Sequence, residues 1–101
     1  MISKELLEEV LGERYIPRLG MEINTYELAH MCKEWAIRKE YQILSGFADR
    51  PAYRKANEKC YARLMWKNKQ HEDSDMYFIT ETEPEATFLA CEWILENDWL
   101  T

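Results

Sequence analysis

The chain has few of the residues that build loop-rich or secreted proteins. Three glycines and three prolines among 101 residues favour dense secondary structure. Three cysteines, Cys32, Cys60 and Cys91, cannot all pair within one chain, and their positions in helical and strand patterns are typical of small buried hydrophobes. No window approaches the ~20 apolar residues of a membrane span, and the segment 1–12 is too acidic for a signal peptide. These absences predict a cytoplasmic protein that does not enter a membrane.

The short motifs of common enzyme classes are also missing. The sequence has no glycine-rich phosphate loop, no GxSxG, no HExxH and no zinc-deaminase pattern. His30 and Cys32 are two residues apart in a helical pattern, which places them on different faces. His71, Glu72 and Asp73 lie together, but no second pair of ligands stands at a metal-site spacing. We therefore predict no catalytic residues, no cofactor and no metal site, and a protein that is not an enzyme.

Apolar and aromatic residues are plentiful. They make up 47% and 13% of the chain, enough to give residues 1–101 the core of a single domain. The four tryptophans, Trp35, Trp66, Trp93 and Trp99, fit either core and rim positions or contacts to a partner. We expect Trp35 and Trp93 to be largely buried on one face of a sheet.

Local signals predict two helices in the first part of the chain. Ser3 can cap a short helix over Lys4–Leu11, and Gly12 can end it. Asn24 can cap a second helix over 25–39, whose apolar residues recur at the spacing of one buried face.

The last part of the chain predicts a strand that leads directly into a third helix, over 83–97. Thr82 can cap this helix, and Glu85 can return a bond to the Thr82 amide as in a capping box. Pro84 falls in the first turn, where its missing N–H costs little. Glu83 and Glu85 place negative charge at the positive end of the helix dipole.

Between these helices the pattern predicts three strands. They cover 41–47, with Gly46 as a bulge or bend, Cys60–Lys67, and 76–82 after a charged hairpin loop at 68–75. Short connections favour antiparallel pairing. The fold class is therefore α+β: a three-stranded antiparallel sheet with two main helices on one face, in the order α-β-β-β-α over 24–97, plus the short N-terminal helix within 1–12.

Charge is distributed unevenly along the chain. The net charge is −6, yet the segment 50–69 holds seven cations and one acid, so it carries +6 and the other residues carry −12. A sheet face presenting aromatic rings and cations from this segment can hold an anionic strand by stacking and phosphate pairing. The alternative is that these cations balance nearby acids, including acids of a neighbouring subunit. The candidate residues for contact with a polyanion or a partner are Arg54, Lys55, Lys59, Tyr61, Arg63 and Lys67.

The predicted α-β-β-β-α order resembles that of a double-stranded-RNA-binding domain, in topology only. Segment 82–86 occupies the place of that family's last strand-to-helix junction. The family has lysines at the start of this helix to contact phosphates, whereas Glu83, Pro84 and Glu85 stand here. The resemblance supports the topology and argues against duplex RNA binding by this surface.

The phrases INTYELAHMCKEWA and ETEPEATFLACEWILEN are similar to those of small uncharacterised bacterial proteins carried by phages and prophages. That resemblance implies a bacterial or phage setting in the cytoplasm. It implies no activity.

Together these observations predict a small, non-enzymatic protein-interaction or accessory protein. The alternative is a module that binds a polyanion, such as single-stranded nucleic acid, through segment 50–69. Self-association as a dimer is also expected, because a sheet covered on one face would expose an apolar patch on the other. That patch would comprise Tyr41 or Leu44, Tyr61, Met65, and Met76 or Tyr77. The competing prediction is that the first helix folds over this face.

Overall fold

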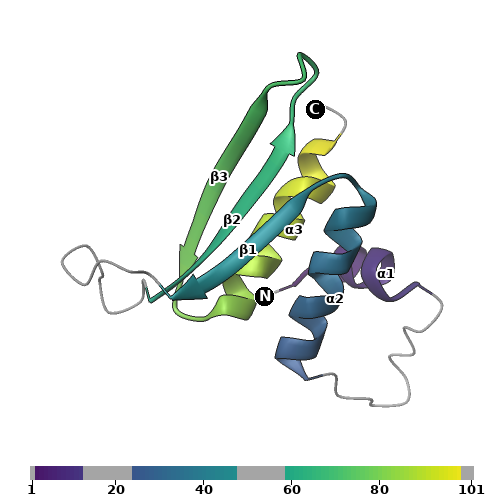
Figure 1. The fold of residues 1–101 in the computed structure, drawn as a ribbon. Helices are drawn as coiled ribbons and strands as arrows, with labels where there is room; N and C mark the ends of the chain where they lie inside the picture. Colours follow the sequence, from purple (N-terminus) through teal and green to yellow (C-terminus); the bar gives the residue numbers. More distant parts are fainter. Residues whose placement is uncertain (1, 13–23, 48–58, 99–101) are drawn as a thin grey trace.

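The computed structural model describes residues 2–12, 24–47 and 59–98, which form a layer of helices against one antiparallel sheet (Figure 1). The predicted α+β class and the α-β-β-β-α order are confirmed. The elements are α1 (Lys4–Leu11), α2 (Thr25–Arg38), β1 (Gln42–Phe47), β2 (Cys60–Lys67), β3 (Asp73–Thr80) and α3 (Glu83–Asn97).

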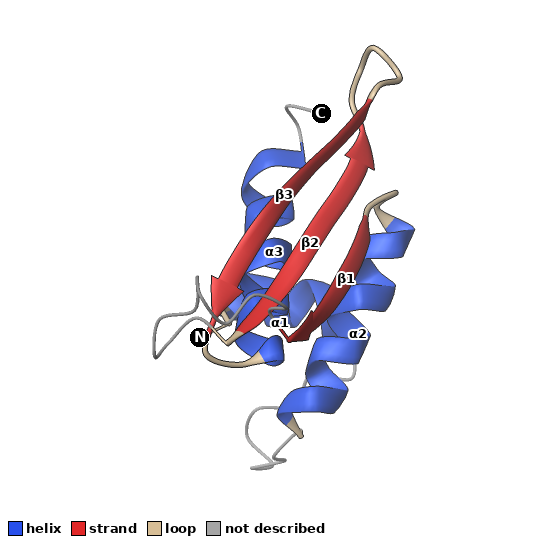
Figure 2. Cartoon of the chain, turned by 60° about the vertical axis from the view of Figure 1, so that its left-hand side comes forward, coloured by secondary structure: helices blue, strands red, loops and turns tan. Residues whose placement is uncertain are grey.

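The sheet has the order β1-β2-β3, with β2 in the centre. Figure 2 shows the three strands in front of the helices, so that α2 and α3 cover only one of the two faces. Both pairings keep a constant register, in which Leu44 lies opposite Arg63 and Arg63 opposite Tyr77. Gly46 therefore lies in a regular pairing, opposite Tyr61, and the predicted bulge there is wrong.

The core lies between the sheet and the helices. Strand β2 alternates as predicted, because its even-numbered residues from Cys60 to Leu64 are buried and its odd-numbered residues are not. Helix α2 contributes Trp35, which is buried, while Trp93 of α3 is partly buried and stacks on Trp66 with ring centroids 4.9 Å apart. Complete burial of one such side chain stabilises the fold by about 1.5–3 kcal/mol.

Each helix begins at its predicted cap. Ser3 Oγ accepts a hydrogen bond from the Leu6 amide (3.1 Å), Asn24 Oδ1 from Tyr26 (2.8 Å), and Thr82 Oγ1 from Glu85 (3.3 Å). Each of these bonds satisfies an amide that the helix itself leaves unpaired. These caps place all three helix starts where the sequence predicts them.

Helix α1 packs on the helical side of the sheet, against α2 and α3 (Figures 1 and 2). Leu6, Val10 and Leu11 are buried in the common core. The amide and hydroxyl of Ser3 both donate to Glu92 Oε1 of α3, at 3.1 and 2.6 Å. The competing prediction that this helix covers the open side of the sheet is therefore wrong, because its apolar stripe is buried within the helical layer.

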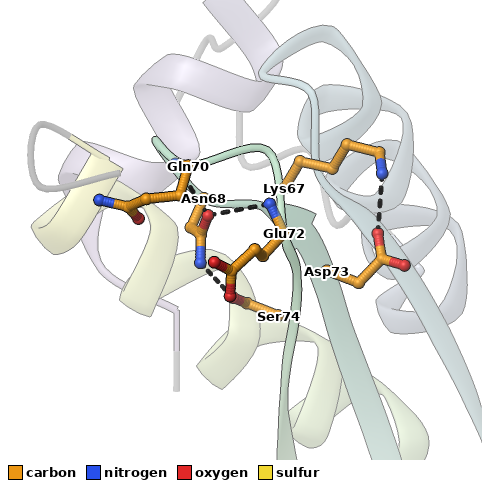
Figure 3. Close-up of polar contacts among 6 residues, drawn as sticks. All are labelled: Lys67, Asn68, Gln70, Glu72, Asp73 and Ser74. Carbon is orange, nitrogen blue, oxygen red and sulfur yellow. Dashed lines mark hydrogen bonds and ion pairs between the residues drawn. The ribbon is translucent and has the colours of Figure 1, made fainter.

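The strand limits differ from the prediction at the β2–β3 hairpin. Strand β3 begins at Asp73, within the stretch assigned to a loop, and ends at Thr80. The turn that joins β2 to β3 is short. Asn68 Oδ1 stabilises it by accepting hydrogen bonds from the amides of Gln70 (2.9 Å) and Glu72 (3.0 Å), as Figure 3 shows. Strand β1 starts one residue later than predicted, at Gln42.

All three cysteines are buried and free, as their sequence context predicts. Cys91 Sγ of α3 donates to the carbonyl oxygen of Cys32 in α2 at 3.6 Å. Hydrogen bonding with Cys32 and burial raise the pKa of the Cys91 thiol. None of the described helices is both long and apolar enough to span a bilayer.

Candidate binding surface

The side of the sheet opposite α2 and α3 is the strongest candidate for a functional surface, and we call it the open face. Every second residue of each strand points to the open face, and the register places these residues side by side on the three strands. Every member is at least partly exposed. The open face consists of Gln42, Leu44 and Gly46 from β1, Tyr61, Arg63, Met65 and Lys67 from β2, and Asp73, Asp75, Tyr77 and Ile79 from β3.

One half of the open face is apolar. Leu44 on β1 and Tyr77 and Ile79 on β3 are 47%, 57% and 53% exposed, which is high for large apolar side chains, and β2 lies between these two strands. The ring of Tyr61 lies over Gly46, where a Cβ atom would be 3.4 Å from Tyr61 Cε1. The rings of Tyr61 and Tyr77 are tilted by 50° with centroids 6.2 Å apart. These contacts join the Tyr61 and Tyr77 rings of β2 and β3 and place Tyr61 over β1 at Gly46, while Arg63 lies between Leu44 and Tyr77.

The other half carries charges that are paired across β2 and β3. Arg63 Nη2 lies 3.0 Å from Asp75 Oδ2, and Lys67 Nζ lies 3.0 Å from Asp73 Oδ1. The guanidinium carbon of Arg63 is also 5.8 Å from the centroid of the Tyr77 ring. The open face thus holds two cations and two carboxylates, and it has no net charge.

The structure brings together some of the predicted contact residues. Tyr61, Arg63 and Lys67 share the open face, as the alternation of β2 predicts. Lys59 is exposed and immediately precedes β2. Arg54 and Lys55 lie outside the described residues.

Sequence reasoning missed the contribution of β3 to this surface. Asp73 and Asp75 belonged to the predicted loop, so their pairing with Lys67 and Arg63 was not foreseen. The signal was present as an alternating series of residues at 73, 75, 77 and 79, in which Asp73 is as far from the turn as Lys67 and Asp75 is within diagonal reach of Arg63. For the apolar patch, the sequence left a choice between Tyr41 and Leu44 and another between Met76 and Tyr77. Leu44 and Tyr77 lie on the open face, while Tyr41 is buried.

A groove of about 780 Å³ adjoins the charged half of the open face. It forms where β2 continues past the first residue of β1, since Gln42 already lies opposite Met65. The rings of Tyr41 and Trp66, with centroids 5.9 Å apart, contribute to its wall. The rest of the lining is mixed and includes both acidic and basic side chains, among them Glu40 and Lys67. The groove therefore favours neither an apolar ligand nor a ligand whose charges are all of one sign.

Two polar clusters lie on the helical side. Lys33 Nζ donates to Ser45 Oγ (2.6 Å), which donates to Glu83 Oε1 (3.0 Å), and this chain of bonds joins α2, β1 and α3. This chain of hydrogen bonds ties the three elements together on the helical side of the sheet. A hollow between α1 and α3 is acidic, and no group of three or more described residues could hold a metal ion. The hollow is lined by Glu5, Glu8, Glu9, Glu92, Leu95 and Glu96.

No protein-family model, curated protein or solved structure matches this chain.

Proposed function

We propose that this protein is not an enzyme and acts by binding protein through the open face of its sheet. The observation that carries the proposal is the exposure of Tyr77 and Ile79 on β3 and of Leu44 on β1, on the same face as the ring of Tyr61, which lies opposite Ile79 and over Gly46. Contiguous apolar surface on a folded domain marks interaction sites, because leaving it in water costs about 25 cal/mol per Å².

The occupant that we propose is a second copy of the chain. A twofold axis brings the same patch of two copies together, so the apolar half of each open face would be covered by the other. The charges on the face are already paired, so no local field on it repels a copy. The acids that make the chain negative include the five carboxylates lining the hollow between α1 and α3, on the helical side.

Sedimentation at micromolar concentration tests this proposal. We expect a species of twice the 12.2 kDa chain mass. The variant Tyr77→Ser with Ile79→Ser should sediment as a monomer and keep its circular dichroism spectrum. Tyr26→Ser is the matched control, because Tyr26 is a similarly exposed aromatic residue on α2. A wild-type monomer, or an equal effect of the control, would refute self-association through this face.

A second candidate function is the binding of single-stranded nucleic acid, and one observation favours it. The half-buried Tyr61 and the exposed Tyr77 form a ring pair beside Arg63, which is an arrangement on which bases can stack. Against it, Arg63 and Lys67 each already have a carboxylate partner on the same face.

Binding of a labelled single-stranded oligonucleotide distinguishes this second function. If the protein has this function, the oligonucleotide should bind detectably at low salt, and its affinity should fall steeply as salt rises. Replacing Arg54, Lys55 and Arg63 by glutamate should abolish the binding without a change in fold. Absence of binding at about 50 mM salt would reject it.

We further propose a bacterial or phage cytoplasm as the setting, on the resemblance of the two helical phrases. Three buried free thiols are compatible with a reducing compartment. Glu83 and Glu85 in the first turn of α3 would repel a duplex RNA backbone, so the double-stranded-RNA-binding topology is not extended to that activity.

A further inference from the structure

Strand β3 forms one edge of the sheet along its whole length. Its inner side pairs with β2 at all eight residues, from Asp73 opposite Lys67 to Thr80 opposite Cys60. Within the described part of the chain, no backbone hydrogen bond reaches its outer side. Among the described residues, the amides and carbonyls that point away from β2 thus have no backbone partner, and an added strand can pair with them.

Most of this edge lacks the features that normally prevent strand addition. Proteins protect exposed edges with charged side chains, proline, a bulge or a short strand. Strand β3 has no proline and no bulge, its charges are confined to Asp73 and Asp75 at one end, and Met76, Tyr77, Phe78 and Ile79 form an uninterrupted apolar run along the rest. The opposite edge, β1, is shorter and lies close to α2 (Figures 1 and 2).

We propose that β3 accepts an extended segment of another protein as a fourth, antiparallel strand. Side chains of the added strand would alternate between the two faces of the sheet. Beside Asp73 and Asp75 they would have to be lysine or arginine, because the Asp73 carboxylate is 90% exposed and its pairing with Lys67 leaves oxygen lone pairs free. Beside the apolar run they would have to be apolar. The structure thus assigns a basic, β-prone segment as the partner.

Self-pairing of β3 is disfavoured by the same charges. When two β3 strands pair in an antiparallel manner about a twofold axis, residues directly opposite each other lie on the same face of the sheet. The axis must therefore pass beside a residue, and each such residue defines one register. Registers centred on Tyr77 or Phe78 place an aspartate opposite Glu81, and like charges in that position are destabilising. The register centred on Met76 places Asp75 opposite Tyr77. A basic partner strand instead places a lysine or arginine beside each aspartate.

A synthetic peptide tests the proposal. The probe is an acetylated and amidated octapeptide with β-branched apolar residues opposite positions 76–79 and lysines opposite Asp73 and Asp75. Two further peptides carry N-methyl groups on alternate backbone amides: one is methylated at the odd-numbered amides and the other at the even-numbered amides. Strand addition uses only one set of amides, so one methylated peptide should lose affinity by about a hundredfold while the other binds as the parent does.

Two controls separate this mode of binding from contact with the open face. Exchanging the peptide lysines for glutamate should weaken binding about tenfold, and Asp73→Lys with Asp75→Lys should reverse that preference. Leu44→Ser, which alters the open face two strands from the edge, should leave peptide affinity unchanged. No binding of the parent peptide, or equal binding of both methylated peptides, would overturn the proposal. Peptide titration reports pairing at the edge of β3, and sedimentation reports association through the open face, so failure of one proposal is distinguished from failure of the other.

Discussion

Replacement of Trp35 by alanine tests the packing of the helical layer on the sheet. Trp35 lies on α2 and is 3% exposed, within the cluster that joins α1, α2, α3 and the sheet. Removing a buried indole costs the lost transfer free energy plus the cavity that remains, about 3–5 kcal/mol. A domain of this size has about 5–15 kcal/mol of stability in total. The substitution should therefore remove a large part of it.

Urea denaturation followed by far-ultraviolet circular dichroism measures this loss, and thermal unfolding should show a fall in Tm of about 12–40 °C. Tyr26→Ala is the matched control, since Tyr26 is an aromatic residue on the same helix and is 64% exposed. Its effect should stay within about 0.5 kcal/mol. A loss below about 1 kcal/mol for Trp35→Ala, or equal losses for the two variants, would refute the assignment of this helix face to the core.

Three smaller perturbations test individual contacts. Thr82→Ala should lower the free energy of unfolding by about 1 kcal/mol and Thr82→Ser should restore it, because the Glu85 amide needs an oxygen partner; no difference between the variants would place the helix start elsewhere. Glu92→Ala should cost about 1.5–3 kcal/mol, since Ser3 loses both of its bonds to α3, and hydrogen exchange should accelerate in α1. All three thiols should resist alkylation until urea unfolds the chain, because they are buried and the pKa of Cys91 is raised, and rapid labelling of the native protein would contradict this.

The helices could be predicted from sequence because their signals are local. A cap and the amide that it accepts are two or three residues apart, as for Asn24 with Tyr26 and Thr82 with Glu85. The apolar spacing of α2 lies within one element. Such signals need no knowledge of the rest of the fold, and all three helices start where they were expected.

The hairpin and the open face depended on pairings between distant residues. Asp73 and Asp75 have low strand propensity, so the sequence pattern favoured a loop there. Asp73, however, lies opposite Lys67, and Asp75 pairs diagonally with Arg63, so their charges stabilise the ladder and the strand extends to Asp73. The same pairing changes the electrostatics of the candidate site, because cations that look available in the sequence already have partners on the sheet.

The position of α1 was also beyond local reasoning. Its apolar stripe shows that it must be buried, but it fits equally well over either layer. The contacts of Ser3 with Glu92 and of Leu6 with the core place it with the helices. The sheet consequently keeps an open face, and no described helix covers it.

Salt dependence separates the dimer from the other two binding modes, because two copies of the chain repel each other at long range, whereas a nucleic acid and a basic peptide are each held by opposite charges. Two copies that each carry −6 repel at long range, while the open faces that meet have no net charge. Added salt screens the repulsion between copies, so the dimer should tighten as salt rises. A nucleic acid bound through lysine and arginine should instead be released, and a basic peptide beside Asp73 and Asp75 should also weaken. A dimer that dissociates with increasing salt would show that charge pairing, rather than the apolar half of the open face, holds the two copies together.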